Sequence, residues 1–152
     1  GDYSRRPYID VIIPSMIDPG MAPPGKHVMS CFVQYAPYEL RDGTWPEKRE
    51  ALGEAVVNTL AEYFPNLKDI ILHRQVVTPL DIEQMTGLSQ GNIFQGELSL
   101  SQLYFLRPAP GYAQYKTPID GYYQCGSGTH PGGGITGAPG RLAAGVILGE
   151  RG

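Results

Sequence analysis

YYQCGSGTHPGGGITGAPGRLAAGVIL, residues 122–148, carries the clearest structural signal in this chain of 152 residues. It opens with a short β-rich run, Tyr122–Cys125. Seven glycines then fall within the fifteen residues of Gly126–Gly140, and the apolar run Arg141–Leu148 follows. Strand formers, turn formers and helix formers in this order predict a strand, a glycine-rich loop and a helix.

The number of glycines in the loop needs a physical reason, because glycine loses more backbone freedom on folding than any other residue. Glycine permits positive φ and lets the main chain approach another surface closely. Thr136 is suited to cap the helix, with Pro139 in its first turn. The N–H groups and the dipole at such a helix start favour an anion or an electron-rich ligand edge. The unit therefore predicts a phosphate or flavin site.

Residues 132–137 also match the dinucleotide-binding spacing G-x-G-x-x-G. An NAD site would need this motif directly after its strand, and a second strand with an acidic residue about twenty positions later. Thr129–Pro131 and other residues separate the motif from the predicted strand, and the sequence ends at Gly152. An independent NAD site is therefore not expected, while glycines that only allow tight packing stay an alternative.

Strands are also predicted upstream of this segment. Two β-rich runs, Tyr8–Ile13 and His27–Tyr35, flank a loop rich in proline and glycine and are expected to pair antiparallel. Further strands are expected at Ile70–Val77 and Tyr104–Leu106. Because the chain opens almost directly into a strand pattern, we expect that further residues precede it.

Two helices are predicted before residue 90. Thr44 and Glu47 have the spacing of a capping box, and apolar residues recur at helical spacing within Leu52–Phe64. Pro65 ends that pattern, and its apolar stripe is expected to pack on a sheet. A second, short helix is expected over Leu80–Met85.

The composition is that of a folded domain. Apolar residues make up 41% and charged residues 18%, which excludes a disordered chain. The net charge is −3 and no basic cluster occurs, so no nucleic-acid partner is expected. The two cysteines and three histidines lack metal-site or redox-motif spacing, so no metal site is predicted. No apolar run reaches the length of a transmembrane helix.

The stretch Tyr123–Gly134, continuing through Gly137–Gly140 to Ala144, resembles the C-terminal flavin-binding signature of phytoene desaturase-like proteins. Shorter segments favour one branch of that family, and the resemblance extends along nearly the whole chain. That branch is expected to have His at the position of Gln95, so no proton-transfer role is assigned to Gln95. The supporting segments are Ala22–His27, Thr78–Glu83, Gly91–Phe94, Gly96–Leu98 and Arg107–Pro108.

The resemblance implies an α+β fold with FAD as cofactor. Residues 1–115 would form a substrate-domain portion, a mainly antiparallel sheet with packed helices, and residues 116–152 a strand–glycine-rich loop–helix segment of an FAD-binding domain. The helix start near Thr136 would face the pyrimidine edge of the flavin. The cofactor-binding residues would be Gly126, Ser127, Gly128, Thr129, His130, Pro131, Gly132, Gly133, Gly134, Ile135 and Thr136.

The resemblance also implies a partner, because the N-terminal half that would hold the ADP part of FAD is not in this sequence. The chain is thus predicted to be the C-terminal portion of an FAD-dependent desaturase or dehydrogenase, inactive alone, that binds FAD weakly or not at all. His130 is interpreted as structural rather than as an acid or base, and no catalytic residue is identified. A small apolar or amine substrate is implied.

Two other functions remain open from the sequence. The chain could be a non-enzymatic interaction module that folds alone and binds no cofactor, or a self-contained nucleotide binder. Retention of FAD by the chain would count against the first of these. A cytoplasmic location is expected, or a mitochondrial one in a eukaryote, while membrane association and assembly into a homo-oligomer stay open.

Overall fold

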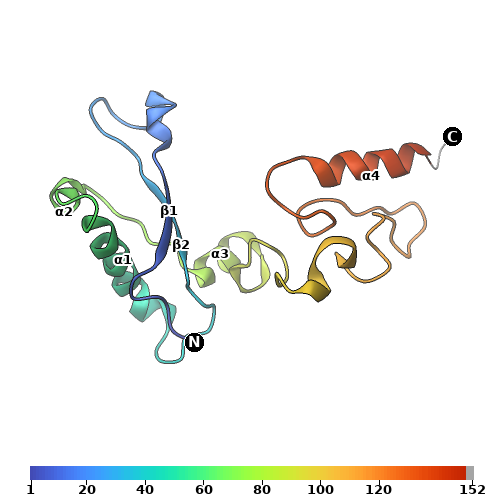
Figure 1. Ribbon diagram of the computed structural model, residues 1–152, viewed down its shortest axis with the longest axis horizontal. Coiled ribbons are helices and arrows are strands. Elements are labelled where there is room, and N and C mark those ends of the chain that lie inside the picture. The colour runs from blue at the N-terminus through green and yellow to red at the C-terminus, as the bar shows by residue number, and fades with distance from the viewer. Residues whose placement is uncertain (150–152) are drawn as a thin grey trace. The chain divides into compact units, whose positions relative to one another are not determined.

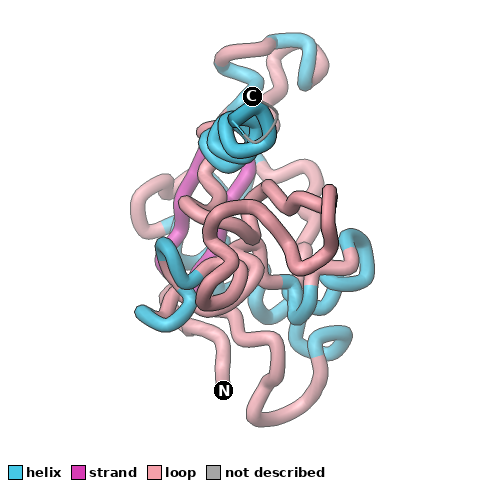
Figure 2. Tube along the Cα trace, turned by 90° about the vertical axis from the view of Figure 1, so that its right-hand side faces the viewer, coloured by secondary structure: helices cyan, strands magenta, loops and turns pink. Residues whose placement is uncertain are grey.

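The computed structural model describes residues 1–149, and the chain divides into two compact units, residues 1–91 and a second unit that begins at Asn92 (Figure 1). The described residues form four α-helices, several short 3-10 turns and one two-stranded sheet. Loops make up much of the trace (Figure 2). The predicted α+β class is confirmed at this coarse level, but the sheet is far smaller than the mainly antiparallel sheet predicted.

The sheet pairs the first two predicted strands. β1 (Tyr8–Ile12) runs antiparallel to β2 (Ser30–Gln34), and Val11 lies opposite Cys31. The predicted pairing is therefore confirmed. β2 begins three residues later than expected, because the Val28 N–H donates to the Ser15 hydroxyl at 3.1 Å rather than to a neighbouring strand.

α1 (Trp45–Ala61) begins as its sequence predicts. The Glu47 carboxylate accepts the Thr44 N–H at 2.8 Å, and this backbone hydrogen bond lowers the pKa of Glu47. The indole N–H of Trp45 donates to the carbonyls of Pro37 and Tyr38 at 3.1 and 3.0 Å. Four apolar side chains of the helix form most of the core of this unit. They are Trp45, Leu52, Val57 and Leu60.

The strand predicted over Ile70–Val77 is absent. A short helix, α2 (Leu67–Ile70), takes the first residue, and residues 71–78 continue as a chain without sheet pairing. Arg74 forms ion pairs of 2.8 Å with two glutamates of α1, Glu50 and Glu54. This segment lies along α1 instead of joining the sheet: Val76 and Arg74 lie beside Gly53 of that helix, while Ile71, Leu72 and Val77 are exposed.

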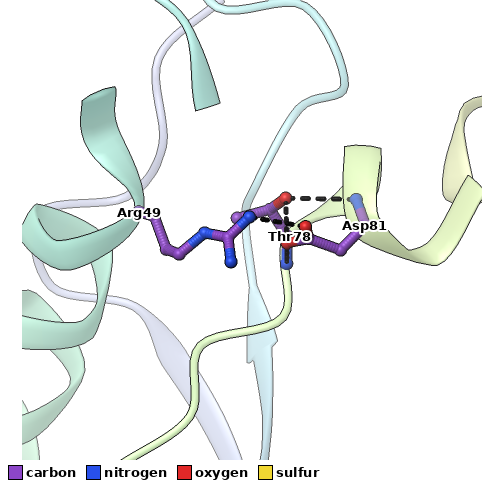
Figure 3. A network of polar contacts seen from close by, with 3 residues as sticks. All are labelled: Arg49, Thr78 and Asp81. Atoms are coloured by element: carbon purple, nitrogen blue, oxygen red, sulfur yellow. Dashed lines mark hydrogen bonds and ion pairs between the residues drawn. The ribbon is translucent and has the colours of Figure 1, made fainter. Parts of the chain in front are cut away.

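α3 (Pro79–Thr86) confirms the second predicted helix. Its cap is a network of three residues (Figure 3). The Thr78 N–H and hydroxyl both donate to Asp81 Oδ2, at 2.7 and 2.6 Å, and Arg49 of α1 pairs with Asp81 Oδ1 at 2.5 Å. Gly87, at φ 74°, ends the helix.

The second unit has little regular structure before α4 (Ala138–Gly149). Two predicted strands are wrong here. Tyr104–Leu106 is a 3-10 turn, because Tyr104 has a φ of 52° and extended pairing cannot pass through it. Tyr122–Cys125 forms one isolated bridge, Lys116 with Tyr123, and the Gln124 N–H donates to the Tyr115 carbonyl at 2.8 Å. The pairing goes no further, because Tyr115 has a φ of 66°.

The compact division at residues 91 and 92 is a property of packing. This division does not test the assignment of residues 116–152 to an FAD-binding domain, which stays a prediction.

Candidate functional site

The eleven residues predicted to bind a cofactor, 126–136, form one irregular loop between the Tyr123 bridge and α4. The loop begins with a tight turn. The N–H and hydroxyl of Thr129 both donate to the Gly126 carbonyl, at 3.1 and 2.9 Å. Thr129 is only 1% exposed and so forms the buried base of this turn, whereas Gly126 at its start is exposed.

Ser127 is held by two residues of the preceding segment. The Gln95 side-chain amide donates to the Ser127 hydroxyl, and Arg107 Nη1 donates to the Ser127 carbonyl at 3.2 Å. Gly128 allows this contact, because a Cβ there would lie 2.8 Å from Gln95 Oε1. Gln95 thus supports the loop through hydrogen bonds.

A third residue supports the loop at His130. The phenol of Tyr115 donates to the His130 carbonyl at 2.8 Å, and Tyr115 is almost fully buried. That burial raises the pKa of Tyr115, so the phenol stays protonated and able to donate across the neutral range. His130 Nδ1 is buried without a hydrogen-bond partner.

The far part of the loop has an exposed surface. Gly133, Gly134, Ile135 and Thr136 are all exposed, and the side chain of Ile135 is fully exposed. Ile135 has a φ of 57°, a left-handed conformation that is unfavourable for a β-branched side chain. The loop thus presents open main chain and one strained apolar side chain.

The loop ends at the start of α4. The Thr136 hydroxyl accepts the Ala138 N–H at 3.2 Å, and the Gly137 carbonyl accepts the Arg141 N–H at 3.0 Å. The helix therefore begins at Ala138, and Gly137 takes the cap position predicted for Thr136. The positive end of the helix dipole lies directly after the open surface of the loop.

A hollow of about 200 Å³ lies beside the support of the loop, with Tyr112, Tyr115 and Gln124 in its lining. Ligand sites for drug-sized molecules usually measure about 300–1,000 Å³. This hollow is therefore too small to enclose a dinucleotide.

Sequence reasoning missed the supporting residues of the loop. Tyr115 carried no signal, and Arg107 was noticed only as part of the Arg107–Pro108 pair. A buried role is difficult to predict for Arg, because arginine is almost never fully buried without a partner. The signal that could have found Arg107 is its place after an apolar turn, Tyr104–Leu106.

Comparison with known proteins shows which class of protein this chain is similar to. It aligns with a dehydrogenase and with desaturases. One of the subunits of the limonene dehydrogenase of Castellaniella defragrans is 33% identical over 90% of this chain and 26% of its own length. A lycopene-forming phytoene desaturase of a Paracoccus strain is 30% identical over 86% of this chain and 26% of its own length.

The narrower resemblance is also confirmed. Pyridine nucleotide-disulfide oxidoreductase domain-containing protein 2 of Rattus norvegicus is 48% identical over 147 residues, 95% of this chain, and its Mus musculus counterpart is 47% identical. The chain spans about a quarter of the length of these relatives and matches their C-terminal part. The resemblance predicted from the glycine-rich segment is therefore correct. No family model matches the chain.

None of the helices within residues 1–149 combines the length and apolar character needed to cross a bilayer.

Proposed function

We propose that this chain is the C-terminal, flavin-contacting portion of an FAD-dependent oxidoreductase that desaturates or dehydrogenates a small apolar or amine substrate. One observation carries the proposal. The loop of residues 126–136 is held from its buried side, while its opposite side is open main chain that leads into a helix N-terminus.

The residues present fit a flavin. A flat aromatic ring can lie against main chain only where side chains are absent, and Gly133 and Gly134 leave that surface open. A Cβ at Gly134 would meet only a methyl of Thr136, at 3.8 Å. The helix dipole at Ala138 favours the negative charge that a flavin gains when it is reduced.

In this proposal the chain orients the cofactor, and the flavin accepts the hydrogen removed from substrate. Residues 126–136 contact the isoalloxazine and ribityl groups. Tyr115 donates to the His130 carbonyl and so fixes the main chain there, which supports a structural rather than acid–base role for His130. The ADP part of FAD binds the N-terminal half of the protein, which is the partner this chain requires.

The first test is the flavin content of the protein expressed from its complete reading frame. We expect the purified protein to carry one FAD, identified by its visible absorption bands and by mass spectrometry after release. A flavin-free protein that cannot be reconstituted with added FAD would contradict the proposal and would favour the interaction module.

A matched pair of variants tests the loop itself. Gly133→Ala would add a methyl to the open surface, where its nearest neighbour is Ser127 Cβ at 3.4 Å, an ordinary contact. Gly145→Ala, exposed on α4 with nothing within 4 Å, is the control. We expect Gly133→Ala to weaken FAD binding about tenfold, or about 1.4 kcal/mol, with unchanged thermal stability. Equal FAD affinity in the two variants would show that the ring does not contact this surface.

A further inference from the structure

Arg107 is a buried cation without an acidic partner. The residue is only 5% exposed, and the ion pairs of the described residues are made by Arg6, Arg49 and Arg74 instead. A buried charge is usually paired, because removing it from water costs several kcal/mol. The absence of a carboxylate beside Arg107 therefore needs a reason.

The guanidinium lies directly behind the loop of residues 126–136. Its Nε donates to the Gln102 carbonyl at 2.7 Å, its Nη1 donates to the Ser127 carbonyl at 3.2 Å, and its Nη2 is buried with no partner. Nη1 is also 3.8 Å from the position that a Cβ on Gly132 would take. Two neutral carbonyls satisfy part of the hydrogen bonding but leave the positive charge uncompensated.

An uncompensated charge in this position affects whatever the loop holds. Water and salt screen a buried charge much less than an exposed one, so its potential extends across the loop. The N-terminus of α4 adds positive potential at the other end of the same segment. Both sources have the sign that stabilises negative charge on a ligand lying against the loop.

We propose that Arg107 is a positioning residue that fixes Ser127 and raises the reduction potential of the flavin held by this loop. The inference rests on the proposed function, because it requires a flavin at residues 126–136. In this inference, the positive charge that raises the reduction potential belongs to Arg107, which supports the loop from its buried side through hydrogen bonds to main-chain carbonyls.

The experiment measures the midpoint potential of the flavin in the protein expressed from its complete reading frame. Arg107→Gln removes the charge but keeps an amide donor for the two carbonyls, and Arg107→Lys keeps the charge. We expect Arg107→Gln to decrease the preference of the protein for reduced over oxidised flavin about tenfold, which lowers the midpoint potential by about 30 mV. Arg107→Lys is expected to retain most of the wild-type potential.

A second pair of variants leaves Arg107 intact, in case Arg107→Gln does not fold. The Gln102 amide oxygen and Arg107 Nη2 lie 2.6 and 3.8 Å from the same position, that of a Cβ on Gly96. Gln102→Glu therefore places a carboxylate near the guanidinium, and it is expected to lower the potential in the same direction. Ser101→Glu, an exposed neighbour, is the control for added negative charge and is expected to have a smaller effect.

The outcomes separate the two proposals. If the wild-type protein holds flavin and its potential is unchanged in both Arg107→Gln and Gln102→Glu, the role of Arg107 is overturned and the proposed function stands. If the wild-type protein holds no flavin, both are overturned. Lower potentials in Arg107→Gln and Gln102→Glu, with wild-type values in Arg107→Lys, support the inference.

Discussion

The residues of and around the loop differ in position: some support it from the buried side, and others lie on its open side. Tyr115 and Arg107 each place a donor on a loop carbonyl and are almost fully buried. Ile135 has no such support role, since its side chain is fully exposed at a φ of 57°. Strain of this kind persists only where the surroundings impose it and is common at ligand sites.

Tyr115→Phe should loosen the loop at His130. The substitution keeps the ring but removes the donor to the His130 carbonyl, which leaves that part-buried acceptor unsatisfied. We expect a loss of about 1–2 kcal/mol in the free energy of unfolding, measured by urea denaturation, and faster hydrogen exchange at residues 127–133. Tyr112→Phe, at an exposed tyrosine, is the control and should change neither. Identical exchange in the two variants would show that this hydrogen bond does not hold the loop.

At the scale of elements, the sequence predicts best those structures that local chemistry specifies. The two helices predicted in the first unit, α1 and α3, begin where their capping residues are, because a capping box satisfies donors within four residues. The prediction of a strand over Ile70–Val77 was wrong because strand pairing depends on residues far away in the sequence. Ile70–Val77 contains the β-branched and apolar residues that favour a strand, but Arg74 pairs with Glu50 and Glu54 of α1, and nothing in the sequence of the segment indicates that packing.

The same reasoning explains the errors in the second unit. The 3-10 turn at Tyr104–Leu106 depends on a positive φ at Tyr104, which is uncommon for a tyrosine and has no signature in the sequence. The glycine-rich loop and its helix were predicted because their residue types are unusual. The groups that hold the loop were missed because burial of Arg107 and Tyr115 results from tertiary packing.

The cap of α3 makes the stability of the first unit depend on pH. Burial alone would raise the pKa of Asp81, but hydrogen bonds from Thr78 and the charge of Arg49 outweigh it and lower that pKa. A lowered folded-state pKa contributes stability above the unfolded value, about 3.9 for Asp. The stability begins to be lost when the pH falls below the unfolded-state pKa, about 3.9. The loss is complete once the pH lies below the lower folded-state pKa.

Asp81→Asn should therefore be destabilising at neutral pH. We expect a loss of about 1–2 kcal/mol, because the hydrogen bonds of Thr78 weaken and the ion pair is removed, although Arg49 is partly exposed and contributes less. The difference from wild type should decrease below about pH 4. Chemical denaturation at several pH values measures this difference in the free energy of unfolding. Asp69→Asn, at an exposed aspartate, is the control. A difference that is constant with pH would exclude the carboxylate as its source.

At the scale of the whole molecule, the proposed function makes the loop of residues 126–136 one surface of a flavin site. The hollow beside the loop, about 200 Å³, is smaller than the space that a dinucleotide needs. The relatives are about four times as long as the segment they share with this chain. On the proposed function, other residues of the longer protein would complete the flavin site.

The proposed function predicts a large difference in FAD affinity between the 152-residue chain and the protein from the complete reading frame. On the proposed function, the 152-residue chain offers the flavin one open face, and the N-terminal half of the longer protein holds the pyrophosphate, so most of the binding free energy of FAD would come from that half. We expect isothermal titration of the chain to give a Kd weaker than about 100 μM, roughly −5.5 kcal/mol, and the protein from the complete reading frame to bind at least about a hundredfold more tightly. Submicromolar FAD binding by the chain alone would contradict this, because the loop and α4 would then have to form a self-sufficient nucleotide site. The positions of the two residues predict which property each variant changes in the longer protein. Gly133 lies on the open side of the loop, so Gly133→Ala should change the affinity for FAD. Arg107 lies behind the loop, so Arg107→Gln should chiefly change the reduction potential of the flavin.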